Sequence, residues 1–219
     1  MTHVVDGPTF DRLADDLLSS LPVVSPEARD IGVALYRLLA GGVPVSSEQL
    51  ARDVGRNHAD VTRVLKELQG LVYFDGERIV GFGGLAVQPM THRLLVDGRQ
   101  LYTWCAWDSL FITHLLNATT HVESTCPETK QSIRLEVTPA GIIWVDPADT
   151  VMSILVPESD SFEHDAVQTM KSFCHFVHFF ASQAAAAAWI TRHPGTALLP
   201  LDKAFALGVR LNQSRWGVQ

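Results

Sequence analysis

Apolar side chains in the N-terminal part of the chain recur at the three- and four-residue spacing of amphipathic helices. This spacing predicts a helix over residues 9–21, and Pro22 ends it. Pro26 suits the first turn of a second helix, which Gly41 and Gly42 stop. We therefore expect the chain to open with two helices and a short connection between them.

Two shorter helices and a hairpin are expected next. Ser46, with Gln49 three residues later, forms a capping box for the first helix, and Asn57 caps the second. The runs LVYF and RIVGF flank Asp75-Gly76, which is typical of a β-hairpin. Helix, helix, helix and hairpin in this order resemble a winged helix-turn-helix.

This region has two interpretations. It can bind DNA through the helix over residues 58–69, as in a thiol-based metal-sensing regulator, or it can be a structural subdomain. The predicted recognition helix carries Arg63 and Lys66 but also Asp60 and Glu67. Phosphate contacts need clustered lysine and arginine, whereas the whole chain has a formal net charge of −7. We therefore expect no nucleic-acid partner.

From Thr91 the pattern changes to short, strand-like runs that prolines punctuate. One run precedes an Asp97-Gly98 turn, and others follow at residues 120–124, 132–137, 141–146 and 151–156. No connection between them is long enough for a parallel βαβ crossover, which favours an antiparallel or mixed sheet. Helices are expected over residues 182–193, capped by Ser182, and 202–212.

The predicted fold class is therefore α+β. A helical, winged-helix-like N-terminal region would cover residues 1–88, and a mixed or antiparallel sheet domain with flanking helices would cover residues 89–219.

Composition places the chain among ordinary folded proteins. Its 219 residues are 47% hydrophobic and 19% charged, and its three cysteines form no disulfide framework. The N-terminus has no apolar run of signal-peptide length, and polar residues interrupt the most apolar stretch, residues 173–190. We expect a soluble cytoplasmic protein with reduced thiols and no membrane partner.

The sharpest chemical feature is the stretch LYTWCAWDSLFITHLL, residues 101–116, which we interpret as a helix. Cys105 and Asp108 are three residues apart, so a helix would place both on one face. A thiolate is a nucleophile and a soft-metal ligand, and the helix start would lower the pKa of the Cys105 thiol. The alternative is that Cys105 is a small buried hydrophobe.

Asp108 has apolar neighbours, Trp104 and Trp107 among them. Burial there would raise the pKa of its carboxyl, so that the group could hold and deliver a proton near neutrality. The alternative is a carboxylate that accepts hydrogen bonds from backbone N–H groups of the first helical turn.

Two further cysteines lie downstream. Cys174 stands in KSFCHFVHFF, which we interpret as a strand; it belongs to the core or faces Cys105 across a site. His175 and His178 leave open a zinc site or a Cys–His nucleophile of a hydrolase, although the paired spacing of zinc sites is absent. Cys126 stands in a polar, turn-like sequence and is interpreted as structural.

At these residues the chain resembles the organomercurial lyases, also called alkylmercury lyases, of bacterial mercury resistance. The similar blocks are RQLYTWCAWDSL, THVESTCPETKQSIRLEVTP, SILVPE, KSFCHFVHFFAS and DKAFALGVRLN, within residues 99–212. The resemblance implies protonolysis of a carbon–mercury bond, which releases hydrocarbon and Hg(II).

The resemblance also implies roles for individual residues. Cys105 and Cys174 match the two thiols that capture mercury, and Asp108 matches the carboxyl that handles the proton and lies beside the metal. Cys126 matches a third, less critical cysteine. His175 stands where many members of the family carry another cysteine. In this family the N-terminal region is not a repressor, which favours the structural interpretation.

The implied partners are an organomercurial substrate, cellular thiols, and a mercuric reductase that receives Hg(II). No organic or metal cofactor is expected, since mercury arrives as substrate and leaves as product. We expect an apolar pocket for the organic group, formed by Trp104, Trp107, Phe173 and Phe176.

Overall fold

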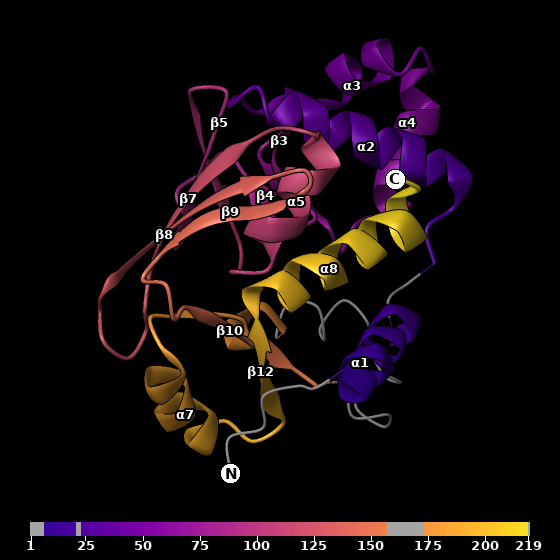
Figure 1. The fold of residues 1–219 in the computed structure, drawn as a ribbon. Coiled ribbons are helices and arrows are strands. Elements are labelled where there is room, and N and C mark those ends of the chain that lie inside the picture. Colours follow the sequence, from indigo (N-terminus) through magenta and orange to yellow (C-terminus); the bar gives the residue numbers. More distant parts are fainter. Residues whose placement is uncertain (1–6, 21–22, 157–172, 219) are drawn as a thin grey trace.

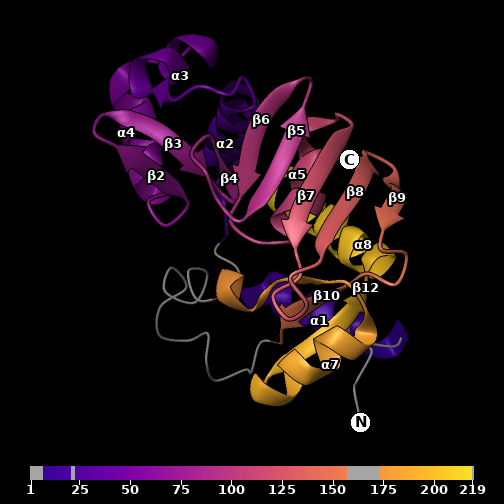
Figure 2. The same cartoon turned by 90° about the vertical axis from the view of Figure 1, so that its left-hand side faces the viewer.

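The computed structural model describes residues 7–20, 23–156 and 173–218, and it has the predicted α+β architecture (Figures 1 and 2). Its helices are α1 (Gly7–Ser20), α2 (Pro26–Leu39), α3 (Ser47–Asp53), α4 (His58–Glu67), α5 (Asp108–Leu116), α7 (Gln183–Arg192) and α8 (Leu201–Leu211). The described residues also form a short 3-10 helix, η1 (Cys174–Phe176), and a π-helical turn, η2 (Asn212–Trp216).

The strands of the larger sheet are β1 (Val45–Ser46), β2 (Val72–Asp75), β3 (Arg78–Phe82), β4 (Leu85–Ala86), β5 (His92–Val96), β6 (Arg99–Thr103), β7 (Thr120–Thr125), β8 (Ser132–Thr138) and β9 (Gly141–Asp146). Those of the smaller sheet are β10 (Val151–Leu155), β11 (Phe179–Phe180) and β12 (Thr196–Pro200).

The N-terminal elements form where the sequence predicts them. The Ser46 side chain accepts a hydrogen bond from the backbone N–H of Gln49 at the start of α3. The Asn57 side chain accepts one from the backbone N–H of Asp60 at the start of α4. The buried face of α4 includes Val61, Val64 and Leu65, as its apolar spacing predicts. The β2–β3 hairpin follows α4, and β1 pairs with β3. The likeness to a winged helix stays a prediction.

Among the described residues, nine strands form one sheet in the order β1-β3-β4-β6-β5-β7-β8-β9, with β2 paired to β3. Every pair in it is antiparallel, in agreement with the predicted sheet type. The β4–β6 pair joins a strand that precedes residue 88 to one that follows it in this sheet. The division into two domains at residue 88 stays a prediction.

The smaller sheet has the order β11-β10-β12. Its outer strand β12 is absent from the sequence prediction, because Thr196–Pro200 is short and ends in a proline. The predicted strand around Cys174 is wrong: Cys174–Phe176 form η1, and only Phe179–Phe180 pair with β10. Cys174 therefore lies in a tight turn ahead of the sheet.

The predicted helix over residues 101–116 is also wrong at its start. Residues Arg99–Thr103 form β6, which pairs with β5 across the Asp97-Gly98 turn, and α5 begins only at Asp108. Both turn residues have positive φ, 48° and 75°, which suits a tight two-residue hairpin. Cys105 consequently lies in the connection between β6 and α5.

Helix α5 lies between the larger sheet and α8 (Figure 1). Its residues from Asp108 to Leu115 are all buried. Two side chains connect it to the C-terminal helices: the Trp107 indole N–H donates to the carbonyl of Ala204 at 3.0 Å, and the Asn212 amide donates to the carbonyl of Phe111 at 2.8 Å. Helix α5, with Asp108 at its N-terminus, is therefore held between the larger sheet and the C-terminal helices.

Among the helices of the described ranges, none has both the length and the apolar character that crossing a membrane requires.

The close packing of α8 on α5 predicts the effect of a single methyl group. A Cβ added at Gly208 would lie 2.7 Å from the Cβ of Phe111, which is too close for unchanged packing. Alanine normally favours a helix over glycine by about 1 kcal/mol, yet we expect Gly208→Ala to lower the free energy of unfolding by about 1–3 kcal/mol. Urea denaturation measures the change.

Ala206→Gly, in the same helix, calibrates the backbone effect, and we expect it to cost about 1 kcal/mol. A gain in stability for Gly208→Ala would contradict the tight contact between the two helices.

Candidate active site

The turn between β6 and α5 positions the first thiol against the carboxyl. The backbone N–H of Cys105 donates to Oδ2 of Asp108 at 2.8 Å, and the Thr103 hydroxyl donates to the carbonyl of Cys105 at 3.0 Å. Asp108 is the first residue of α5, so its carboxylate closes the turn as a capping group does. The three-residue spacing thus brings the two groups together through a turn.

The second thiol comes from the segment that follows β10. Ser153, fully buried on β10, donates its hydroxyl to the carbonyl of Phe176 at 2.7 Å and accepts from the backbone N–H of His178 at 3.0 Å. The backbone N–H of Ala106 donates to the carbonyl of Val177 at 3.3 Å. These bonds hold η1, with Cys174 at its start, beside the turn that carries Cys105.

As a result, the structure brings all three sequence-predicted site residues together. The Sγ atoms of Cys105 and Cys174 and a carboxylate oxygen of Asp108 all lie within 4.8 Å of one another. Cys105 and Asp108 are buried, whereas Cys174 is half-buried. Two sulfur donors and one carboxylate around a single gap suit a soft, thiophilic metal.

Burial controls the proton affinity of this cluster. It raises the pKa of Asp108 to about 7, against the opposing effects of the Cys105 thiol and the backbone N–H groups of Cys105 and Trp104. Burial also raises the pKa of the Cys105 thiol well above its usual value, and the neighbouring Cys174 and Asp108 add to this. The sequence prediction of a lowered Cys105 pKa is therefore wrong, because the residue precedes the helix and is desolvated.

A glycine makes room for the carboxyl. Gly84 has a φ of +100°, and a Cβ built on it would lie 2.5 Å from Cγ of Asp108. The backbone at this position also accepts a hydrogen bond, since the Trp104 N–H donates to the carbonyl of Gly84 at 2.9 Å. Only a residue without a side chain fits between the carboxyl and the strands β3 and β4.

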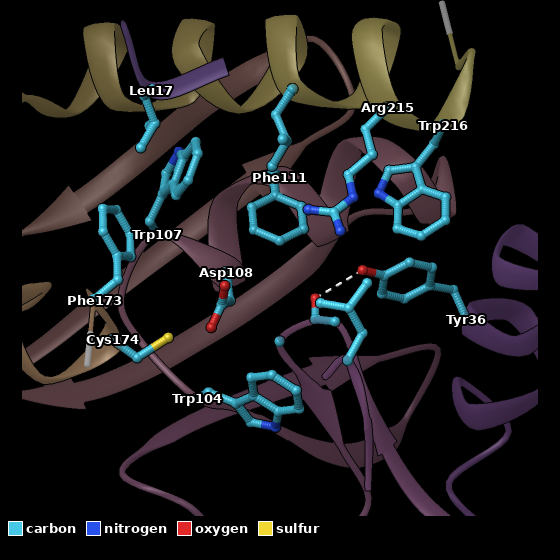
Figure 3. Close-up of a pocket in the computed structure, with 14 residues that line it drawn as sticks. Leu17, Tyr36, Trp104, Trp107, Asp108, Phe111, Phe173, Cys174, Arg215 and Trp216 are labelled. Carbon is cyan, nitrogen blue, oxygen red and sulfur yellow. Dashed lines mark hydrogen bonds between the residues drawn. The ribbon is translucent and has the colours of Figure 1, made fainter. Parts of the chain in front are cut away.

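An apolar pocket of about 70 Å³ adjoins the cluster, and Asp108 and Cys174 lie in its wall (Figure 3). Most of its other lining side chains are apolar, among them Leu17, Trp104, Trp107, Phe111, Phe173 and Trp216. Three of the four residues predicted for a pocket, Trp104, Trp107 and Phe173, line this one. Phe176 is the exception: it packs instead against Trp189 and His193.

The remaining candidates lie outside the cluster. Nε2 of His178 lies 2.8 Å from the carbonyl oxygen of His175, and among the described residues neither ring bonds to Cys105. The open alternative of a Cys–His nucleophile therefore gains no support. Cys126 is buried in the β7–β8 turn, where its Sγ accepts from the backbone N–H of Thr129 at 3.5 Å. This agrees with a structural role.

Three residues of the site were not predicted from the sequence. Ser153 and Gly84 act through contacts between segments far apart in the chain, although a serine within the apolar run VMSILV is a usable signal. Arg215 lines the pocket beside Tyr36, and nothing in its local sequence indicates that it is buried.

Comparison with known proteins gives a consistent result. A family model described as alkylmercury lyase matches residues 85–213. The alkylmercury lyase of Staphylococcus epidermidis is 38% identical over 177 residues, which cover 81% of this chain and 79% of the relative. That of Pseudomonas putida is 40% identical over 176 residues, 80% of each chain.

The fold has a counterpart among solved structures. A crystal structure of the mercury-bound form of MerB2 superposes with a TM-score of 0.71 at 25% identity, covering 93% of this chain and 97% of the other. The resemblance seen in the sequence is thereby confirmed, and the chain belongs to the alkylmercury lyase family.

Proposed function

We propose that this chain cleaves the carbon–mercury bond of organomercurials by protonolysis and releases a hydrocarbon and Hg(II). The observation that carries this proposal is the cluster of two thiols and one carboxyl within 4.8 Å, at the wall of an apolar pocket. Membership of the alkylmercury lyase family supports it. The chemistry can be written from these three side chains alone.

Cys174 binds the mercury of the substrate first. Its side chain lines the pocket and is half-buried, whereas Cys105 is 1% exposed. The Cys174 sulfur attacks mercury in a thiol complex RHg–SR′, a bond forms between them, and the external thiol leaves with the Cys174 proton. The organic group then occupies the apolar pocket, which excludes water from the reacting bond.

Cys105 and Asp108 complete the reaction as a pair. As the Cys105 sulfur adds to mercury, its proton passes to the carboxylate of Asp108, which lies within 4.8 Å. Two sulfur ligands push electron density onto the carbon, and Asp108 delivers the proton there as the carbon–mercury bond breaks. The products are the hydrocarbon and Hg(II) held by two thiolates, with every proton accounted for.

The further partners follow from this product. A two-coordinate mercuric dithiolate exchanges with external thiols, so small cellular thiols would remove Hg(II), and a mercuric reductase would receive it. No organic or metal cofactor enters the reaction as written. Because free thiols are needed at every step, we place the reaction in the reducing cytoplasm.

The first test is turnover of phenylmercury in excess thiol, followed by the release of benzene and inorganic mercury. We expect Cys105→Ser, Cys174→Ser and Asp108→Asn each to lower benzene release by at least about a hundredfold, because each removes a sulfur ligand or the proton carrier. Cys126→Ser is the matched control, since it makes the same change outside the cluster, and it should retain activity within about threefold.

Full benzene release by Cys174→Ser would remove the two-thiolate step. Loss of activity in His175→Ala with full activity in Asp108→Asn would instead indicate a Cys–His nucleophile.

A second test uses the pH dependence of kcat/KM, which reports ionisation of the free enzyme. Asp108, with a pKa of about 7, accepts the Cys105 proton only when it is ionised. Below pH 7 the carboxyl is already protonated, so kcat/KM for phenylmercury should fall about tenfold per pH unit as the pH is lowered. Above pH 7 the profile should level off, because the Cys105 thiol stays protonated there.

Asp108→Asn should lack this acidic limb in its residual activity. A wild-type kcat/KM that is constant or rises as the pH is lowered from 7 to 5 would contradict the transfer of a proton from Cys105 to Asp108.

A further inference from the structure

The pocket beside the cluster contains a buried positive charge that the reaction described above does not use. Arg215 lies in η2 and is only 8% exposed. Among the described residues, its Nε has no hydrogen-bond partner and no carboxylate lies within ion-pair distance of its guanidinium. A guanidinium keeps its charge in proteins, so burying it without a partner is costly.

The neighbours of Arg215 leave its donors available. The ring of Trp216 lies 5.6 Å from the guanidinium carbon, a cation–π contact. The Tyr36 hydroxyl donates to the carbonyl of Gly83 at 2.7 Å, and among the described residues it forms no hydrogen bond with Arg215. Nearby, Arg29 adds a second positive charge, and its guanidinium donates to the carbonyl of Ser214 at 3.1 Å.

The position of Arg215 relates this charge to the reaction site. Arg215 lines the same pocket as Asp108 and Cys174. In Figure 3, Cys174 and Asp108 lie on one side of the pocket, whereas Arg215, Tyr36 and Trp216 lie on the other, with Phe111 between. A ligand with mercury at the thiols and an organic body along the aromatic side chains would therefore reach the guanidinium with its far end.

We infer that Arg215 binds a carboxylate carried by the mercurial ligand, so that the preferred substrates of this enzyme are carboxylate-bearing organomercurials. The planar fork of a guanidinium matches a carboxylate in two parallel hydrogen bonds, and the apolar wall strengthens the attraction. The carboxylate belongs either to the organic group or to the thiol bound to mercury. This inference rests on the proposed lyase function.

The test compares matched substrates in wild type and variants. Phenylmercury and 4-carboxyphenylmercury differ only in the carboxylate on the organic group, and each is assayed with excess 2-mercaptoethanol or 3-mercaptopropionate, which differ in the charge of the thiol. In at least one of the two pairs, the mercurials or the thiols, we expect the wild-type kcat/KM to be higher with the carboxylate-bearing member by about tenfold or more. Arg215→Gln should abolish that preference, measured as the ratio of kcat/KM for the charged and the neutral member of each pair.

Two further variants identify the cause. Arg215→Lys keeps the charge but loses the fork, so it should restore part of the preference. Arg29→Gln removes the neighbouring charge, which lines an adjacent pocket together with Arg215, and it should leave the preference unchanged. A preference that depends on the aryl carboxylate assigns it to the organic group, and one that depends on the thiol carboxylate assigns it to the thiol.

A measurement on the wild type alone covers the case in which the Arg215 variants do not fold. Benzoate should inhibit phenylmercury cleavage at a concentration at least about tenfold lower than benzamide, its neutral counterpart. Equal inhibition by the two, or an unchanged preference in folded Arg215→Gln, would overturn the inference while cleavage of phenylmercury upholds the lyase. If wild type cleaves neither mercurial, the lyase proposal itself fails, and this inference with it.

Discussion

The burial of one carboxyl group is the constraint on which the rest of the site depends. Asp108 is the first residue of α5 and lies inside the protein, where its carboxylate accepts a hydrogen bond from the backbone N–H of Cys105. Burial raises the pKa of this carboxyl to about 7. A surface aspartate, with an ordinary pKa of about 4, would be too weak a base to take the proton from the Cys105 thiol. The helix that begins at this residue is in turn fixed by hydrogen bonds from Trp107 to α8 and from Asn212 to Phe111.

The second constraint is that two distant segments share one gap. The Cys105 turn belongs to the larger sheet, and Cys174 follows the smaller sheet, so neither thiol alone defines a site. The Ser153 hydroxyl and the hydrogen bond between Ala106 and Val177 connect the two segments. Polar groups buried in this way fix a geometry because leaving any of them unpaired would be costly. The arrangement places two sulfurs at a separation that one large metal atom can bridge.

Much of this could be predicted from the sequence, and the failures have physical reasons. Side-chain caps such as Ser46 and Asn57 act within three residues, so local sequence identified them. The apolar run before Asp108 fits helical and strand spacing equally well. It forms a strand because β6 pairs with β5, which local sequence does not reveal. The spacing of Cys105 and Asp108 indicates chemistry, and the family resemblance implies their roles together with Cys174, whereas their meeting in space required the fold. Arg215 could not be found, because only tertiary packing buries it.

The high proton affinity of the Cys105 sulfur has a consequence for the resting protein. Oxidants such as peroxides react with the ionised form of cysteine, and this sulfur stays protonated behind an apolar wall. Hard cations such as magnesium do not displace such a proton, whereas a soft thiophilic metal does. The Cys105 sulfur therefore stays unreactive in the resting protein, and it reacts only when a mercury compound binds at the site.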